Sequence, residues 1–160
     1  MEKMGLVLTL PDGKFSGLYS QMGKEIAEKV TLLDQDQEIL IVNHIRDRDT
    51  VAEVLEKYEV EYEDFLFLLL PSNAVLKPFF TDYGFSTRLG HHFLFAKMVA
   101  CFRFVGITTE SKCGQALAQA EEHLLASWIS REGEMCAVDV ELRELIGGIA
   151  RAYRCKVTWL

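Results

Sequence analysis

Two kinds of apolar pattern alternate along the first 70 residues, and this alternation constrains the fold more than any other feature of the chain. Residues 5–10 form a short continuous apolar run, which is typical of a buried strand, and residues 38–45 contain a second such run. After each run, apolar residues recur every three or four positions, as they do on one face of a helix. This order of strand-like and helix-like segments indicates β-α-β units.

The helix signals of this part are specific. One helix is expected from about Ser16, where apolar side chains recur every four residues. A second is expected to start at Thr50, because Thr50 and Glu53 have the spacing of a capping box, in which each side chain bonds the other residue's backbone N–H.

The pattern of the remaining residues predicts a helical middle segment, followed by a C-terminal part that contains both helices and strands. Residues 65–70 are all apolar and fit either a strand or a helix, although the aromatic content and the following Pro71 favour a strand. The periodicity then predicts short helices within 74–82 and 86–100, a strand at 101–107 and a helix over 109–130. Asp139 is a suitable N-cap for a last helix, which precedes a strand that contains Val157 and Trp159.

These elements predict one globular domain over residues 1–160. The expected fold class is α/β or α+β, a layered sheet of four to six strands with helices packed on at least one face and a helical middle segment. The chain has 160 residues, of which 49% are hydrophobic, so it can bury a sizeable core. No linker-like or low-complexity stretch divides it.

Charge and cysteine usage exclude several classes of function. The net charge of −7 disfavours electrostatic binding of the whole chain to nucleic acid or to an anionic membrane. The longest apolar runs are shorter than a membrane span. Four cysteines at irregular spacings indicate free thiols, and the N-terminus lacks the pattern of an export signal, so we expect a cytoplasmic protein.

An aromatic middle is the most distinctive stretch. Residues 65–104 hold nine of the ten phenylalanines, with four Lys or Arg and one Asp. Most of these rings are expected in the core. A crowded group of four is expected to remain partly at the surface as a binding patch: Phe79, Phe80, Tyr83 and Phe85.

The densest group of titratable nitrogen lies just after this patch. On the expected helix, Arg88 and His92 lie one turn apart, with His91 beside them. A histidine there could act as general acid or base while Arg88 holds an anion. No acidic residue within one turn orients either ring, so a polar surface face is the competing interpretation.

The sequence offers weaker signals for an anion site and a metal site. Lys14 and Ser16 lie between a strand and a helix N-terminus and could touch a phosphate, but neither a Walker A motif nor a dinucleotide fingerprint is present. Histidines and cysteines lack metal-ligand spacings. We therefore predict no metal and no cofactor.

Two functions remain. The first is a non-catalytic binding or adaptor protein, which self-associates as a homodimer or binds a partner through the aromatic-rich residues 79–95. The alternative is a small enzyme or ligand-binding domain with an anionic or apolar small-molecule cleft near Arg88, His91 and His92. The sequence names neither the ligand nor the reaction.

Overall fold

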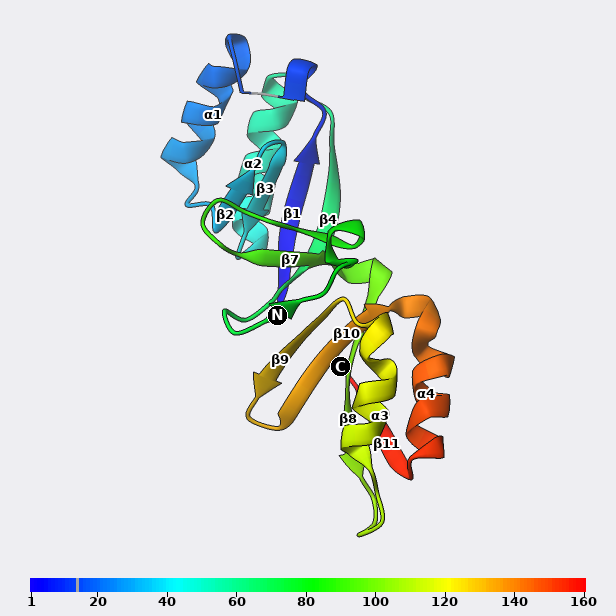
Figure 1. Ribbon diagram of the computed structural model, residues 1–160. Coiled ribbons are helices and arrows are strands. Elements are labelled where there is room, and N and C mark those ends of the chain that lie inside the picture. Colours follow the sequence, from blue (N-terminus) through cyan, green and yellow to red (C-terminus); the bar gives the residue numbers. More distant parts are fainter. Residues whose placement is uncertain (14) are drawn as a thin grey trace. The chain divides into compact units, whose positions relative to one another are not determined.

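The structure is a computed structural model that describes residues 1–13 and 15–160. Over these residues, four α-helices pack on two antiparallel sheets of six and five strands (Figure 1). The expectation of a layered fold with helices on a sheet is confirmed, in its α+β form. The chain divides into two compact units, unit 1 (Met1–Leu69 and Ser86–Phe93) and unit 2 (Leu70–Phe85 and Leu94–Leu160), and each is described by itself.

Unit 1 is a β-α-β-β-α-β arrangement. Its elements are β1 (Glu2–Leu8), α1 (Leu18–Lys29), β2 (Asp34–Asp36), β3 (Ile39–Val42), α2 (Ile45–Lys57) and β4 (Tyr62–Leu69), with a 3-10 turn at Pro11–Gly13. The strands lie in the order β2-β3-β1-β4, and every neighbouring pair is antiparallel. This is the order of the ferredoxin-like split β-α-β motif.

The two faces of this sheet are covered differently. Leu6 and Leu8 of β1 are buried in a core that includes Met22 of α1 and Leu55 of α2. Gly5 alternates with Leu6 and so faces the other way, where a Cβ would lie 2.2 Å from a ring atom of Phe67. A glycine is therefore required at this place.

A contact between two aromatic rings lies on the same face of the sheet as Phe67. The buried rings of Phe67 and Phe93 meet edge to face with centroids 6.3 Å apart. Phe93 is the last residue of the Ser86–Phe93 segment, which joins unit 1 from a distant part of the sequence. The contact explains how a segment beyond residue 69 belongs to the first unit.

Unit 2 has the same topology, with one extra edge strand. Its elements are β5 (Val75–Leu76), β8 (Val99–Gly106), α3 (Cys113–Ala120), β9 (Ala126–Ser130), β10 (Gly133–Asp139), α4 (Arg143–Ala152) and β11 (Cys155–Trp159). The strand order is β11-β8-β10-β9-β5. From β8 to β11 the connectivity again follows the split β-α-β motif, and a core forms between the sheet and both helices, with Phe102, Ala116 and Ile146 among its members.

The remaining elements are short. They are β6 (Gly84–Ser86), β7 (His92–Phe95) and the 3-10 helices Phe80–Asp82, Ala96–Met98, Glu121–His123 and Val140–Leu142. With β7 and β6 the first sheet has the order β2-β3-β1-β4-β7-β6. The chain passes from one unit to the other after Leu69, Phe85 and Phe93. Whether the whole chain behaves as one domain stays a prediction.

The expected helical middle segment is wrong. Residues 74–100 form short strands and 3-10 turns in place of two helices. Within the segment 86–100, Leu89 is 70% exposed, whereas Phe93 and Leu94 are both buried. Aromatic rings at irregular spacings can be buried one at a time by short strands, so the apparent helical period carried no information here. The ambiguous run 65–70, by contrast, does lie mainly in a strand, β4.

Two helix limits are also wrong. Helix α2 begins at Ile45, and the Thr50 hydroxyl donates to the Arg46 carbonyl at 2.9 Å, as a mid-helix threonine does, so the capping box is absent. The helix expected over 109–130 stops at Ala120, and β9 and β10 form a hairpin after it. Asp139 does act as a cap: its carboxylate accepts from the Glu141 N–H at 2.9 Å, at the 3-10 turn that precedes α4.

Candidate functional site

A tight turn in unit 1 carries Arg88. Thr87 and His91 close it, because the Thr87 N–H donates to the His91 carbonyl at 2.9 Å and the Gly90 N–H donates to the Thr87 carbonyl at 3.0 Å. Gly90 has a φ of 84°, which favours glycine. Arg88 and Leu89 lie exposed at the tip. We call residues 87–91 the 87–91 turn.

A buried carboxylate holds the base of this turn. Asp34, the first residue of β2, is only 4% exposed. Its Oδ2 accepts from the Thr87 hydroxyl and from His91 Nδ1, both at 2.6 Å, and its Oδ1 accepts from the Gln35 N–H at 2.7 Å. Three donors thus satisfy a group that would be costly to bury alone.

Asp34 also fixes the histidine. The Nδ1–H group of His91 donates a hydrogen bond to Asp34. In the neutral ring, Nε2 is therefore the nitrogen that can accept a hydrogen bond or a proton. The ring of His91 stands edge-on to Phe93, with centroids 6.2 Å apart, and its side chain is half-buried. A histidine oriented by a carboxylate is the arrangement that general acid-base catalysis uses. Asp34 is not identifiable from local sequence patterns, because it lies 57 residues from His91.

His92 has different surroundings. Its Nδ1 lies 2.7 Å from the Ser86 hydroxyl. His91 is in the turn and His92 begins β7, so the helical face expected for Arg88 and His92 is absent. The structure therefore couples His91 to an acidic group, the carboxylate of Asp34.

The four aromatic candidates lie in unit 2 and differ in exposure. Phe80 is 2% exposed and so belongs to the interior, while Phe79 is 60% exposed. Tyr83 donates to Asp139 Oδ2 at 2.5 Å, and this bond to the carboxylate, with burial, raises the pKa of Tyr83. Phe85 is half-buried and packs near Phe95, with centroids 6.1 Å apart. Of the four, Phe79 presents the most open apolar surface.

The proposed anion site has little support. Ser16 is exposed, and Gly17, not Ser16, occupies the N-cap position of α1, with no side-chain cap. Lys14 lies outside the described residues. The sequence expectation for these two residues therefore remains a prediction.

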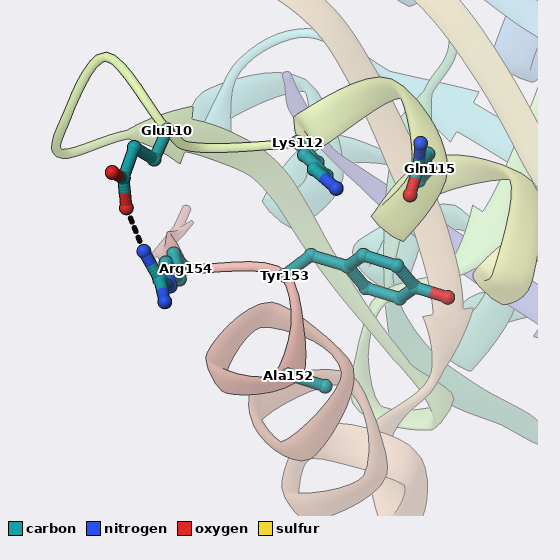
Figure 2. Close-up of a pocket in the computed structure, with 6 residues that line it drawn as sticks. All are labelled: Glu110, Lys112, Gln115, Ala152, Tyr153 and Arg154. Atoms are coloured by element: carbon teal, nitrogen blue, oxygen red, sulfur yellow. Dashed lines mark hydrogen bonds and ion pairs between the residues drawn. The ribbon is translucent and has the colours of Figure 1, made fainter.

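Unit 2 contains a pocket that the sequence analysis did not predict. It has a volume of about 480 Å³ and is lined by Glu110, Lys112, Gln115, Ala152, Tyr153 and Arg154. Figure 2 shows these residues in two groups, one on the loop before α3 and the first turn of that helix, and one at the end of α4 and in the turn that follows it. An ion pair between Glu110 and Arg154 lies at one end. Both cationic and neutral polar groups are thus available to a small polar ligand.

The described part of the chain offers no cluster of three or more His, Cys, Asp or Glu side chains that could hold a metal ion. Among its helices, none is long and apolar enough to cross a membrane. No protein-family model matches the chain, and no curated protein is significantly similar to it in sequence. The side chains themselves are therefore the basis for any functional assignment.

Proposed function

We propose that this chain is a non-catalytic binding protein that self-associates through the tip of the 87–91 turn. One observation carries the proposal: Asp34 holds the base of the turn by two hydrogen bonds of 2.6 Å, while Arg88 and Leu89 are exposed at the tip. A turn that is already ordered loses little conformational entropy when it binds. Arginine is also one of the residue types most enriched among the anchors of protein interfaces.

Charge favours a second copy of the chain as the partner. Residues 1–64 carry seven Lys or Arg and fifteen Asp or Glu, whereas residues 65–104 carry four Lys or Arg and a single Asp. Arg88 of one copy therefore meets an acid-rich surface on another copy, and complementary charge assists association. The exposed Phe79 of unit 2 offers a second apolar contact.

Sedimentation of a matched pair of variants tests this proposal. Leu89→Ser removes the exposed apolar side chain at the tip, and Leu18→Ser removes another exposed leucine of unit 1, at the start of α1. At micromolar concentration, the wild type and Leu18→Ser are expected to sediment above the 18.2 kDa monomer. Leu89→Ser is expected to weaken self-association at least about tenfold, the effect of losing one anchor.

Either of two results would overturn the proposal. The first is a wild-type protein that stays monomeric throughout the micromolar range. The second is a wild-type oligomer that Leu89→Ser and Leu18→Ser affect equally, because the contact would then lie elsewhere.

A second function, acid-base catalysis on a small molecule, is favoured by one observation. The carboxylate of Asp34 orients His91 at 2.6 Å, and the exposed Arg88 lies three residues before it. In this alternative, Nε2 of His91 accepts a proton from the substrate, and Arg88 binds an anionic group.

Hydrolysis of p-nitrophenyl acetate, a substrate that reports reactive histidines, distinguishes the two functions. If His91 is catalytic, His91→Ala is expected to lower the protein-dependent rate at least about tenfold, within the range of a general base contribution. His92→Ala is the matched control, since its partner is Ser86. Equal rates for wild type and both variants would exclude an activated His91 and leave binding as the function.

A further inference from the structure

Two thiols of unit 2 lie almost within bonding distance. Cys113 is the first residue of α3 and Cys155 is the first residue of β11, and their Sγ atoms are 2.7 Å apart. The S–S bond of a disulfide is about 2.05 Å long, so the two sulfur atoms are already close to this distance. Both cysteines are free in this structure.

The backbone around the pair is held on both sides. The Lys112 N–H donates to the Tyr153 carbonyl at 3.0 Å, and the Ser111 hydroxyl donates to the Arg154 carbonyl at 2.5 Å. The same hydroxyl accepts from the N–H groups of Ile107 and Thr108. These bonds keep the two segments together without a covalent link.

The pair also adjoins the unit 2 pocket in the sequence. Lys112 and Arg154 line that pocket, and each directly precedes one of the two cysteines (Figure 2). A bond between the thiols would therefore join the two segments from which the pocket is built.

The other two thiols provide an internal comparison. Cys101 and Cys136 are buried on neighbouring strands of the same unit, where Cys101 pairs with Ala137 and Cys136 pairs with Phe102. Because successive residues of a strand face opposite sides, their side chains point away from each other. Unit 1 contains no cysteine.

We propose that Cys113 and Cys155 form a modification site, a dithiol that a low-molecular-weight disulfide such as oxidised glutathione converts reversibly to an intramolecular disulfide. The thiolate of Cys113, the half-buried member, attacks the small disulfide and releases one thiolate. The thiolate of the buried Cys155 then attacks Cys113 Sγ and releases the second. The two protons lost by the cysteines are taken up by the two released thiolates, so the protein is oxidised by two electrons and the small disulfide is reduced to two thiols.

The environment of Cys113 sets the speed of this exchange. Burial and the hydrogen bond to Cys155 raise the pKa of Cys113 to about 11. Little thiolate is present at neutral pH, so the reaction is slow there. Below this pKa, the rate rises about tenfold for each unit by which the pH is raised.

The test is oxidation of the full chain by oxidised glutathione at pH 8.5, followed by intact mass and peptide mapping. The wild type is expected to lose two hydrogen atoms in mass and to yield a peptide that links Cys113 to Cys155. The double variant Cys101→Ala/Cys136→Ala is the matched control and is expected to oxidise identically. Cys113→Ser and Cys155→Ser are each expected to form no intramolecular link.

The thermal midpoint provides an independent readout. The link joins two residues that are 42 positions apart in the sequence, and it therefore restricts the unfolded chain. The thermal midpoint of the oxidised protein is expected to be at least about 5 °C higher than that of the reduced protein. Dithiothreitol should restore the lower midpoint. Three results would each overturn the proposal: no link after oxidation of the folded protein, a link that involves Cys101 or Cys136, or adducts of glutathione that persist on Cys113.

Discussion

At the scale of single residues, Asp34 has the most consequential position in unit 1. Its carboxylate is buried and receives hydrogen bonds from Thr87, His91 and the Gln35 backbone. Removing a buried acceptor leaves its donors without a partner, which costs more than the bond itself contributes. The position of the 87–91 turn therefore depends on a residue that is more than 50 positions away in the sequence.

Asp34→Asn tests this dependence. The amide keeps the shape of the side chain but places an NH₂ group near donors, so we expect the free energy of unfolding to fall by about 1–3 kcal/mol. Asp36→Asn, in the same strand and half-buried, is the control and should change it by no more than about 0.5 kcal/mol. Urea unfolding measures both. Equal losses would mean that Asp34 does not hold the turn.

Sequence reasoning found Arg88, His91 and His92 but could not find the group that orients them. Helical spacing places residues three or four apart together, and in this chain the turn instead brings His91 to Asp34 through the tertiary fold. The only available signal was an acidic residue at the start of a short strand between charged neighbours, which does not distinguish a buried carboxylate from an exposed one.

At the scale of elements, the two units end their second helices in the same way. Helices α2 and α4 are each followed by a tyrosine and then by a residue with positive φ, Glu59 at 56° and Arg154 at 57°. After α2, the Val60 N–H donates to the Leu55 carbonyl and the Glu59 N–H to the Glu56 carbonyl, both at 3.0 Å. This is a Schellman motif with a residue other than glycine at its left-handed position.

Replacing that residue should stabilise unit 1. We expect Glu59→Gly to raise the free energy of unfolding by about 0.5–1 kcal/mol, because glycine adopts positive φ without steric cost. Glu63→Gly, at an exposed position in β4, should lower it by about 0.5–1 kcal/mol. Urea melts of the two variants give opposite signs in this account. A loss of stability in both would contradict the assigned backbone conformation.

Helices α1 and α2 are also joined by Glu25. Its carboxylate accepts from Lys57, Lys29 and Tyr58, and these bonds lower its pKa from 4.5 to about 2. A carboxyl whose pKa is lower in the folded state stabilises the fold when it is ionised. Its contribution is therefore complete above about pH 4.5 and disappears as the pH falls toward 2.

The pH dependence of unfolding tests this link. Between pH 5 and pH 2, the urea midpoint of Glu25→Gln is expected to fall less steeply than that of the wild type. Glu28→Gln, at an exposed position of the same helix, should follow the wild type. Parallel curves for wild type and Glu25→Gln would show that the three hydrogen bonds do not stabilise the fold.

The strong patterns of the first 70 residues predict the type of the main strands and helices there, whereas the pattern over residues 109–130 does not. In the segment expected as one helix over 109–130, the apolar residues Leu124, Leu125 and Ala126 are all buried, and they enter a hairpin. A stripe of apolar residues can continue from a helix into a strand without a break in its spacing. The boundary is then decided by tertiary packing, which no local pattern records.

At the scale of the whole molecule, the chain contains the same β-α-β-β-α-β topology twice. No internal sequence period indicates this, because a fold is specified mainly by the pattern of apolar and polar residues, and different residues satisfy one pattern. The two units are also interleaved in sequence: Ser86–Phe93 of unit 1 lies between two segments of unit 2. Neither unit can be cut out as one continuous piece.

This interleaving predicts cooperative unfolding. Both tryptophans, Trp128 and Trp159, are in unit 2, so tryptophan fluorescence reports that unit, whereas far-UV circular dichroism reports helices in both. We expect the two signals to give the same urea midpoint, as a single domain does. Two separate midpoints would show that the units unfold independently and would contradict the single-domain prediction.

Self-association through the 87–91 turn is most directly tested by a concentration series of ¹H–¹⁵N spectra. As the protein concentration rises through the micromolar range, the amide resonances of Arg88, Leu89 and Gly90 are expected to shift or broaden along a saturable curve, while that of Leu18 stays constant. In the Leu89→Ser variant the same resonances should change only at concentrations at least about ten times higher. Spectra of the wild type in which the turn resonances stay fixed while others change, or in which nothing changes at all, would contradict the proposed function.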